Sequence, residues 1–409
     1  MATPFRKVLL LDTTLREGEQ TPYVSFTVEQ KLRIARLLDE IGVDMIEVGH
    51  PNVSPDIDQF IKEVAREGLG AEVVAHCRAK DEDIEKAISY GVDRVAVFLG
   101  TSKSHLKSKL RMGEDEALNM VYQVIKKAGG HGVKVRFAAE DAARTDPNYL
   151  IEICKVAIEA GADRISLPDT VGNQTPDGIR SLFRNVHKEL GAELDAHCHN
   201  DLGLAVANSL AAMEGGATCI HVTVNGLGER VGIASLSNLA VALKVLYNID
   251  TVGLDRLIEV SRMVEEYSGI RIPHNMPVIG GYAFSHKAGL HTTAVLKDPS
   301  TYEAFCPSLV GRDRKIVIDK FTGREAVRSR LVEMGLPLEE EVVSMIVETI
   351  KRVPHQPLNT DEEFRRFVNS CLYNNTTKGG GQEYERGQIL QEHPKSRDKE
   401  DIGAVVSHR

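Results

Sequence analysis

Several features are missing from this 409-residue sequence, and each absence excludes a class of protein. No run of about 20 uninterrupted apolar residues is present, so a membrane-spanning helix is not expected. The first residues, MATPFRKVLLLDTT, have no cleavable signal pattern, because their apolar run extends only from Val8 to Leu11. We therefore expect a soluble, cytoplasmic protein without a membrane partner.

Cysteine pairs at CxxC spacing and an excess of positive charge are also lacking. The six cysteines are scattered, which predicts reduced thiols and neither a disulfide framework nor a zinc knuckle. The formal net charge is −9 and the pI is near 5.9. This charge argues against nucleic acid as a main partner, although local basic clusters can still hold an anionic cofactor.

The first 250 residues repeat one theme, a short β-rich run that ends in polar residues and is followed by a helical pattern. The eight runs are Val8–Thr14, Met45–His50, Glu72–Cys77, Arg94–Gly100, Lys134–Asp141, Arg164–Thr170, Glu193–Asn200 and Cys219–Asn225. Helical patterns such as Val28–Ile41 lie between them, and glycines such as Gly42 and Gly91 suit left-handed helix ends. Eight βα units in about 250 residues predict a closed (β/α)8 TIM barrel of the α/β class.

The repeat stops after Ile249. Val252–Ser268 has the pattern of one amphipathic helix, and residues from about 322 to 352 are again helical in pattern. We expect a catalytic barrel over residues 1–270 and a smaller, mainly helical C-terminal region over 271–375. Residues 376–409 have few large apolar side chains and predict a flexible tail.

Polar side chains gather where the predicted strands end, which is where barrel enzymes place their chemistry. The residues at these ends are Asp12, Arg16, Glu17, Glu47, His50, His76, Arg136, Glu140, Asp169, Thr170, His197, His199 and Asn225. Solvated strand ends without function are the alternative explanation. Eight unrelated loops would not concentrate acids, histidines and arginines so consistently.

Two histidines and one glutamate predict a metal site. His197 and His199 flank Cys198 on a predicted strand, where residues i and i+2 share a face. An HxH pair alone is a weak signal, and a core or surface pair is the alternative. Glu17, at another strand end, adds a carboxylate, and these three ligands leave open positions on a divalent ion. Such ligands suit Mg, Mn, Zn, Co or Fe, so the identity of the metal stays open.

Seven ordered segments carry a resemblance to a known family. They are DTTLREGEQ (12–20), EVGHP (47–51), RFAAEDAARTD (136–146), PDTVG (168–172), HCHND (197–201), NGLGER (225–230) and FSHKAGLH (284–291). Between residues 8 and 335 the chain resembles the acetyl-CoA-dependent Claisen condensing enzymes, namely isopropylmalate, citramalate and homocitrate synthases, within a superfamily of barrel metallolyases. The resemblance implies a homodimeric, metal-dependent acyltransferase whose substrates are acetyl-CoA and a small 2-oxo acid.

The resemblance also implies a role for each matching residue at the ketone. Glu17, His197 and His199 would bind the metal, which the 2-oxo acid would chelate through its carboxylate and keto oxygens. Arg16 would stabilise the alkoxide that forms on the keto oxygen. A purely structural salt bridge from Arg16 to Glu17 or Glu140 is the alternative.

Removal of a proton from the methyl group of acetyl-CoA needs a base and a donor for the enolate oxygen. The family draws these groups from the barrel and from the neighbouring subunit. Glu140, His291 and Tyr302 stand at the matching places, and His286 is an alternative to His291. Each of these residues can also have a structural role alone.

Three positions favour the homocitrate branch, whose 2-oxo acid is 2-oxoglutarate. His76 matches a substrate-side histidine of that branch, and Arg136 offers a planar fork for a second carboxylate. Ile233 stands where the other branches generally have Asn. The remaining substrate-binding candidates are Gln20, Glu47 and Thr170.

Two departures from that branch keep other substrates open. Ala138 stands where the branch generally has a Ser that helps to hold the distal carboxylate, and Asp195 replaces a more frequent Glu. A missing hydroxyl donor costs about 1 kcal/mol or more when a carboxylate is left short of a partner. The pocket can therefore bind 2-oxoglutarate with altered affinity, or another acidic 2-oxo acid such as oxaloacetate or phosphonopyruvate. Pyruvate and 2-oxoisovalerate are further alternative substrates for the same chemistry.

Two other classes of function are also open at this point. A lyase of the same superfamily would use the same barrel and metal for the reverse cleavage, but FSHKAGLH and Tyr302 resemble the synthases. A non-catalytic barrel that binds metabolites is disfavoured, because every expected polar site position except Ala138 is filled.

Overall fold

The computed structural model describes residues 7–352, 358 and 360–376, and the chain divides into two compact units. The first unit includes the chain up to His286 together with Ala294–Ile316. The second unit includes Lys287–Thr293 and the described residues from Val317 onwards. Each unit has its own buried apolar residues and is described by itself.

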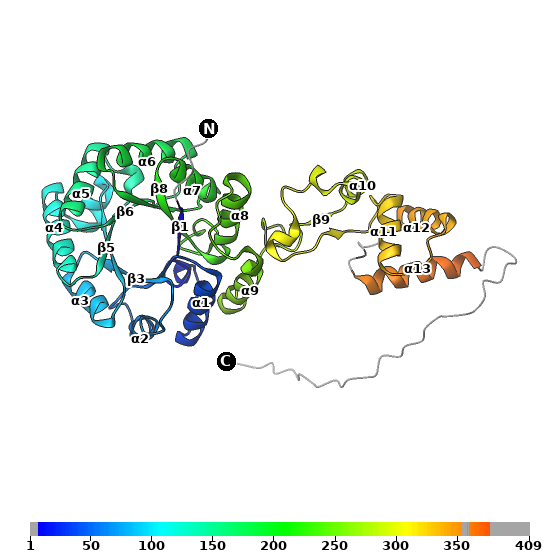
Figure 1. Cartoon of the computed structure of the whole chain (residues 1–409), viewed down its shortest axis with the longest axis horizontal. Helices are drawn as coiled ribbons and strands as arrows, with labels where there is room; N and C mark the ends of the chain where they lie inside the picture. The colour runs from blue at the N-terminus through cyan, green and yellow to red at the C-terminus, as the bar shows by residue number, and fades with distance from the viewer. Residues whose placement is uncertain (1–6, 353–357, 359, 377–409) are drawn as a thin grey trace, which may run out of the picture. The chain divides into compact units, whose positions relative to one another are not determined.

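Eight parallel strands close into a barrel in the first unit, in sequence order, with β1 hydrogen-bonded to β8 (Figure 1). The strands are β1 (Leu9–Asp12), β2 (Met45–Gly49), β3 (Glu72–Arg78), β4 (Arg94–Gly100), β5 (Lys134–Glu140), β6 (Arg164–Asp169), β7 (Glu193–Cys198) and β8 (Ala217–Val222). Each strand coincides with one of the eight runs predicted from the sequence, to within a few residues. The prediction of a TIM barrel is therefore confirmed.

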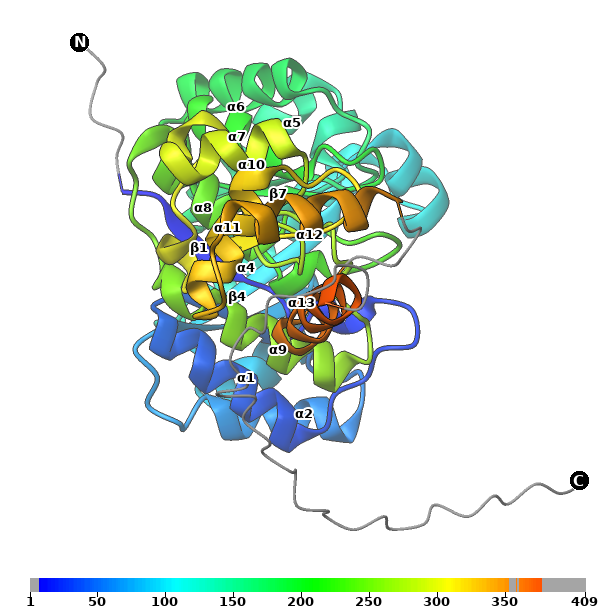
Figure 2. The same cartoon turned by 90° about the vertical axis from the view of Figure 1, so that its right-hand side faces the viewer.

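Helices alternate with the strands and surround them, and Figure 2 shows the adjacent pair α1 and α2 side by side. They are α1 (Val28–Ile41), α2 (Pro55–Val64), α3 (Asp81–Tyr90), α4 (Glu114–Gly129), α5 (Pro147–Glu159), α6 (Pro176–Leu190), α7 (Ala205–Glu214) and α8 (Leu236–Tyr247). α9 (Leu257–Ser268) follows a 3-10 turn at Leu254–Arg256, so the single helix predicted from Val252 begins later than expected.

Local sequence explains where these helices begin and end. At the start of α1, Thr27 and Gln30 form a capping box, in which each side chain accepts a hydrogen bond from the other residue's backbone N–H. The helix ends at Gly42, whose φ of 90° is the left-handed conformation expected for that glycine. Gly91 ends α3 in the same way, with a φ of 88°. The chain is thereby turned back into the next strand.

Six strands end one to three residues earlier than their sequence patterns predicted, and β7 and β8 are two of them. β7 stops at Cys198, and His199 instead forms an isolated antiparallel bridge with Ile233. β8 stops at Val222 and is followed by a 3-10 turn in which Asn225 has a φ of 59°. Both strand ends therefore turn into loops, and these loops carry candidate site residues.

The interior of the barrel is layered. A small apolar cluster contains Leu11, Met45, Val74, Ala96 and Cys219. A buried charged layer also lies among the strands, with Arg136, Glu47, Arg164 and Asp195 each less than a tenth exposed. All six cysteines of the chain are free thiols, which confirms the sequence-based prediction.

The second unit is mainly helical. It contains α11 (Arg324–Glu333), α12 (Glu340–Arg352) and α13 (Asp361–Thr376), which confirms the helical pattern predicted for residues 322 to 352. Leu331, Ile346 and Phe364 are among its buried apolar side chains. The tail predicted over residues 376–409 lies outside the described residues, apart from Thr376 at the end of α13.

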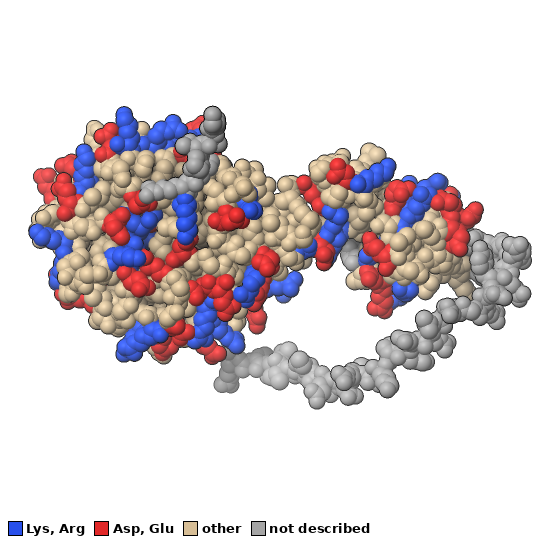
Figure 3. Space-filling view, in the orientation of Figure 1, with Lys and Arg blue, Asp and Glu red and all other residues tan. Residues whose placement is uncertain are grey.

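Three shorter elements belong to the region after the barrel. β9 (Ser285–His286) pairs in parallel with β10 (Lys315–Ile316) in the first unit, and α10 (Gly289–Lys297) contains residues of both units. No helix within the described part of the chain is long and apolar enough to span a bilayer. On the barrel face seen in Figure 3, acidic and basic side chains are interspersed and form no extended basic surface.

Candidate active site

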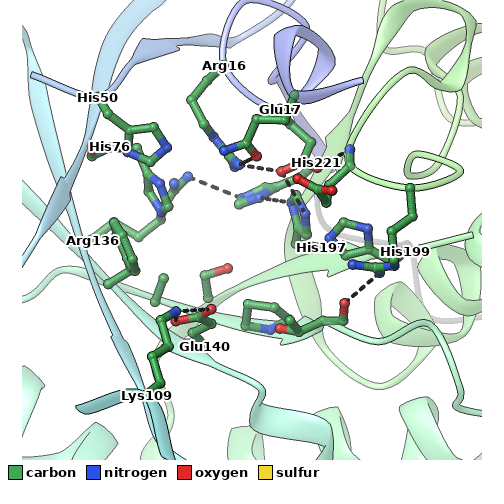
Figure 4. Close-up of a pocket in the computed structure, with 18 residues that line it drawn as sticks. Arg16, Glu17, His50, His76, Lys109, Arg136, Glu140, His197, His199 and His221 are labelled. Atoms are coloured by element: carbon green, nitrogen blue, oxygen red, sulfur yellow. Dashed lines mark hydrogen bonds and ion pairs between the residues drawn. The ribbon is translucent and has the colours of Figure 1, made fainter. Parts of the chain in front are cut away.

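A cavity of about 370 Å³ lies at the carboxyl ends of the barrel strands (Figure 4). The predicted site residues that line it are Arg16, Glu17, Gln20, His76, Arg136, Glu140, Thr170, His197 and His199. Glu47 is fully buried beneath this lining and binds two of its arginines. Residues far apart in the sequence thus meet in one pocket.

Glu17, His197 and His199 form a compact buried cluster, in which their potential ligand atoms all lie within 4.8 Å of one another. The Nε2 atom of His197 faces Oε2 of Glu17 at 3.9 Å. The backbone N–H of Glu229 donates to Oε1 of Glu17 at 2.9 Å. A Cβ at Gly228 would lie 3.0 Å from that same oxygen, so a glycine lets the NGLGER loop approach the carboxylate closely.

The protonation states of this cluster fit a divalent cation. Burial lowers the pKa of His197 and of His199, so both imidazoles are neutral and keep a nitrogen lone pair. Burial alone would raise the pKa of Glu17, but the charges of Arg16 and His199 and the hydrogen bond from Glu229 together lower it. The Nδ1 atom of His199 is also buried without a hydrogen-bond partner among the described residues. Two neutral imidazoles and one carboxylate are a donor set that divalent metals accept.

Arg16 lies in the loop after β1 and connects two carboxylates. Its Nε donates to Oε2 of Glu47 at 2.6 Å, and its Nη1 donates to Oε2 of Glu17. The salt bridge to Glu17 that the sequence left open is therefore present. Gln20 contributes a longer contact, with its Oε1 at 3.4 Å from Nη1 of Arg16.

Arg136 lies at the bottom of the cavity with both terminal nitrogens already in contact with the protein. Its Nη2 donates to Oε1 of Glu47, and its Nη1 lies 3.2 Å from Nε2 of His221. Its Nε is buried without a hydrogen-bond partner among the described residues. The planar fork that the sequence assigned to a substrate carboxylate is thus occupied by Glu47 and His221 in this structure.

A buried chain of polar groups extends from the candidate metal cluster into the barrel, and sequence reasoning missed its central residue, His221. The Nδ1 atoms of His197 and His221 lie 3.2 Å apart, and Nε2 of His221 lies 3.3 Å from Oδ2 of Asp195. Arg164 donates to Oδ1 of Asp195 at 2.7 Å. Burial alone would raise the pKa of Asp195, but the charge of Arg164 and the hydrogen bond to His221 lower it to about 2.

Asp195, Cys219 and His221 also lie close enough together to hold a metal ion. The charges around them argue against that use. The Asp195 carboxylate is already neutralised by Arg164, and burial raises the pKa of the Cys219 thiol well above its ordinary value. We therefore interpret these residues as a hydrogen-bond network and not as a second metal site.

Glu140, the predicted base, lies at the end of β5 and forms an ion pair. Both of its carboxylate oxygens lie 2.7 Å from Nζ of Lys109, which also lines the cavity. Next to it, the backbone N–H of Asp141 donates to the hydroxyl of Thr170 at 3.0 Å. Lys109 lies in the π-helix His105–Leu110 after β4, and no pattern in the sequence distinguished it from neighbouring surface lysines.

His76 belongs to a small aromatic cluster on one side of the cavity. Its ring stacks on Phe98 with centroids 4.5 Å apart, and Nδ1 of His50 lies 2.8 Å from its backbone oxygen. Burial lowers the pKa of His76 well below the ordinary value and that of His50 to about 4. His76, predicted to lie near the substrate, is therefore a neutral imidazole that lines the pocket.

Ser166 is a further pocket residue that the sequence analysis did not identify. It lies on β6 directly opposite Ala138 of β5 in the strand register, and both residues line the cavity. Ser166 is 1% exposed, and its short polar side chain lies on the pocket wall. The Ser–Ala register pair is visible only once the pairing of β5 with β6 is known.

The residues predicted to come from the neighbouring subunit lie beyond the barrel strands. Tyr302 follows a 3-10 turn in the first unit, is 49% exposed, and is not among the described residues that line the cavity. His291 is an exposed residue of α10 and belongs to the second unit. His286, the alternative, lies 3.2 Å from a carboxylate oxygen of Glu303.

Comparison with known proteins agrees with this geometry. The HMGL-like family profile matches residues 7–264, and the profile described as homocitrate synthase post-HMGL domain-like matches residues 278–357. A crystal structure of the HMG-CoA lyase of Bacillus subtilis superposes with a TM-score of 0.61 at 24% sequence identity, covering 66% of this chain and 97% of the lyase. At 24% sequence identity, this similarity shows a shared fold and not a shared activity. The barrel and its site place the chain among the HMGL-like proteins.

Two relatives with high sequence identity narrow the assignment to one family. The chain is 50% identical over 369 residues to a homocitrate synthase of Sulfurisphaera tokodaii, covering 89% of this chain and 80% of the relative. It is 49% identical over 406 residues to a homocitrate synthase of Sulfolobus acidocaldarius, covering 98% of this chain and 83% of the relative. The chain belongs to the homocitrate synthase family.

Proposed function

We infer that this chain is an acyltransferase that condenses acetyl-CoA with 2-oxoglutarate to give homocitrate and CoA. The observation that carries the inference is about 50% identity to homocitrate synthases over about 90% of the chain. The pocket supports it, because a buried carboxylate and two neutral imidazoles meet at the carboxyl ends of barrel strands. Barrel enzymes carry out their chemistry at that end.

We propose that Glu17, His197 and His199 hold the divalent metal of the enzyme, which can be Mg, Mn, Zn or Co. An ion bound there supplies Lewis acidity to the ketone of the 2-oxo acid. The lowered pKa values of the three residues keep the carboxylate charged and the imidazoles neutral, which is the state that ligation requires.

Arg16 is proposed to stabilise negative charge on the keto oxygen. Its guanidinium lines the cavity next to Glu17, and Glu47 holds it in place through Nε at 2.6 Å. A buried, pre-oriented cation stabilises developing charge more strongly than a cation in water. Glu140, at the opposite wall, is proposed to remove the methyl proton of acetyl-CoA, since it is the carboxylate of β5 that lines the same cavity.

The distal carboxylate of 2-oxoglutarate is proposed to bind among Arg136, His76, Ser166 and Thr170. Arg136 brings positive charge to the bottom of the cavity, and Ser166 brings a hydroxyl that can donate a hydrogen bond. A hydrophobic 2-oxo acid such as 2-oxoisovalerate would place methyl groups against these polar atoms. The polar lining therefore favours a dicarboxylic substrate.

His291 and Tyr302 are proposed to act in the active site of a second copy of the chain, as a homodimer would allow. The support is that Tyr302 is exposed and is not among the described residues lining the cavity of its own chain. Mixing two inactive variants, Glu17→Ala and His291→Ala, tests this. Shared sites restore up to a quarter of the wild-type rate after subunit exchange, whereas sites confined to one chain restore none.

The substrate is tested by a panel of 2-oxo acids with acetyl-CoA, in which release of the CoA thiol is measured. The panel contains 2-oxoglutarate, oxaloacetate, pyruvate, 2-oxoisovalerate and phosphonopyruvate. We expect kcat/KM for 2-oxoglutarate to exceed that for 2-oxoisovalerate by at least about tenfold, which corresponds to about 1.4 kcal/mol. A preference for 2-oxoisovalerate, or thiol release without any 2-oxo acid, would contradict the proposed function.

A further inference from the structure

The Nδ1 atom of His197 does not face the candidate metal cluster. It lies 3.2 Å from Nδ1 of His221, whereas Nε2 of the same ring faces Glu17 at 3.9 Å. His221 in turn reaches Asp195 through its Nε2 at 3.3 Å. Asp195, His221 and His197 are all buried, with exposed fractions of 0%, 2% and 6%.

Counting protons along this chain leaves two arrangements. The contact between the two Nδ1 atoms at 3.2 Å holds one proton, which belongs either to His197 or to His221. When Asp195 accepts a hydrogen bond from Nε2 of His221, the Nδ1 of His221 is unprotonated and accepts from Nδ1–H of His197. The Nε2 of His197 then carries a lone pair, directed toward Glu17.

The second arrangement reverses each of these hydrogen bonds. Arg136 can only donate, and its Nη1 lies 3.2 Å from Nε2 of His221. If that bond forms, His221 is protonated on Nδ1 and donates to Nδ1 of His197. The proton of His197 then sits on Nε2, where it blocks ligation. Asp195 and Arg136 thus compete for one nitrogen of His221, with opposite consequences for His197.

We propose that His221 is a positioning residue, which with Asp195 fixes the tautomer of His197 so that Nε2 is free to bind the divalent ion. The proposal rests on the assignment of Glu17, His197 and His199 as the metal ligands. Arg164 holds Asp195 in place at 2.7 Å and keeps it available as the acceptor. In this arrangement Nη1 of Arg136 has no acceptor on His221, and its remaining partner in the network is Oδ2 of Asp195 at 3.6 Å.

Two substitutions of His221 separate this role from simple packing. His221→Asn places an amide oxygen near the position of Nδ1 and can still accept from His197. His221→Leu fills similar volume but accepts no hydrogen bond. If His221 served only to pack the interior, the Leu variant would bind metal at least as tightly as the Asn variant. If His221 positions His197, the Asn variant binds metal more tightly than the Leu variant.

The measurement is the affinity of the metal-free, full-length chain for Mn²⁺, from the EPR signal of the free ion. We expect His221→Asn to bind within about threefold of the wild type and His221→Leu to bind about 10- to 100-fold more weakly. His131→Leu, a substitution of an exposed histidine, is the control and should bind as the wild type does. Equal affinities for Asn and Leu, or tighter binding by Leu, would overturn the proposal.

Two further arms keep the test decisive. Asp195→Asn retains the shape of the side chain but removes its charge, and it should weaken Mn²⁺ binding at least threefold. This variant tests the proposal even if His221→Leu fails to fold. Unchanged affinity in Asp195→Asn would overturn the proposal. Glu17→Ala tests the metal site itself. If the wild type binds no Mn²⁺, or Glu17→Ala binds it equally well, the ligand assignment fails, and that outcome differs from a failure confined to His221.

Discussion

Both carboxylate oxygens of Glu140 lie 2.7 Å from the ammonium nitrogen of Lys109 at the wall of the barrel pocket. The carboxylate that we propose as the base for the methyl proton is thus held by a cation in the π-helix His105–Leu110. Glu140→Gln keeps the shape of the side chain but cannot take up a proton. We expect kcat for CoA release to fall by roughly 10²- to 10⁴-fold, while Mn²⁺ binding stays within about twofold of the wild type.

The matched control for Glu140→Gln is Glu159→Gln, an exposed glutamate at the end of α5. It should retain the wild-type rate. A Glu140→Gln enzyme with a rate within threefold of the wild type would show that another group removes the proton.

Removal of the metal should abolish turnover. We expect the chelator-treated chain to release no CoA from acetyl-CoA and 2-oxoglutarate, and added Mn²⁺ to restore the rate. His199→Ala should lower the bound metal, measured by elemental analysis, from about one ion per chain to less than a tenth of that. His131→Ala is the control, because that histidine is exposed and lies outside the pocket. Full metal content in His199→Ala would contradict the assignment of the ligand set.

Ser166 offers a test of how the distal carboxylate is held. Ser166→Ala removes a donor from the pocket, and we expect KM for 2-oxoglutarate to rise about 5- to 30-fold, the equivalent of roughly 1–2 kcal/mol, with kcat changed less than threefold. Pyruvate has no distal carboxylate, so any turnover of pyruvate should be unaffected. The steady-state rates with both substrates are the measurement.

A second variant places the hydroxyl on the opposite strand. Because Ala138 faces Ser166 in the register of β5 and β6, the double variant Ala138→Ser/Ser166→Ala returns a hydroxyl to the same part of the pocket. It should recover most of the lost affinity for 2-oxoglutarate. An equal rise in KM for pyruvate and 2-oxoglutarate in Ser166→Ala would point to a general distortion of the site instead.

We expect the side chain of Asp12 to make the free energy of unfolding depend on pH. Burial raises the pKa of Asp12 from 3.8 to about 7, and its Oδ2 has no hydrogen-bond partner among the described residues. The folded state therefore keeps a proton that the unfolded chain releases near pH 4. The stabilising effect of that proton is fully present below pH 4, declines as the pH rises toward 7, and is absent above that value.

The variant Asp12→Asn resembles the protonated residue and cannot titrate. Its free energy of unfolding, relative to that of the wild type, should increase by about 2–4 kcal/mol between pH 4 and pH 8. Urea unfolding of the metal-free proteins at several pH values measures this difference. A difference that is constant over this range would mean that Asp12 is ionised throughout. The backbone N–H of Thr14 donates to Oδ1 of Asp12 at 2.8 Å, a bond that Asn can keep.

The periodic parts of the molecule were predictable, because strand and helix periods are local properties of the chain. The run Lys134–Asp141 predicted β5, which extends from Lys134 to Glu140. The ends of β7 and β8 were placed too late. There a loop competes with the strand, since Ile233 pairs with His199, and the sequence of β7 does not reveal that partner.

The candidate site was predictable where its chemistry follows a short motif. His197 and His199 are separated by one residue, and Glu17 lies in a segment that resembles the synthases, so the cluster could be proposed before its geometry was known. His221 and Lys109 could not be found in this way. Neither residue lies in a recognisable motif. His221 contacts His197, 24 positions away in the sequence, and Lys109 contacts Glu140, 31 positions away.

The sequence by itself determined that eight βα units form a barrel with acids, histidines and arginines at the strand ends, because hydrophobic periodicity and short motifs act over a few residues. Only the tertiary structure decided which of these charges are already paired. Closure of the barrel brings Glu47 of β2, Arg136 of β5 and His221 of β8 together, so Arg136 meets Glu47 and His221 across 89 and 85 positions of sequence. Strand register, which depends on the whole sheet, likewise set Ser166 opposite Ala138.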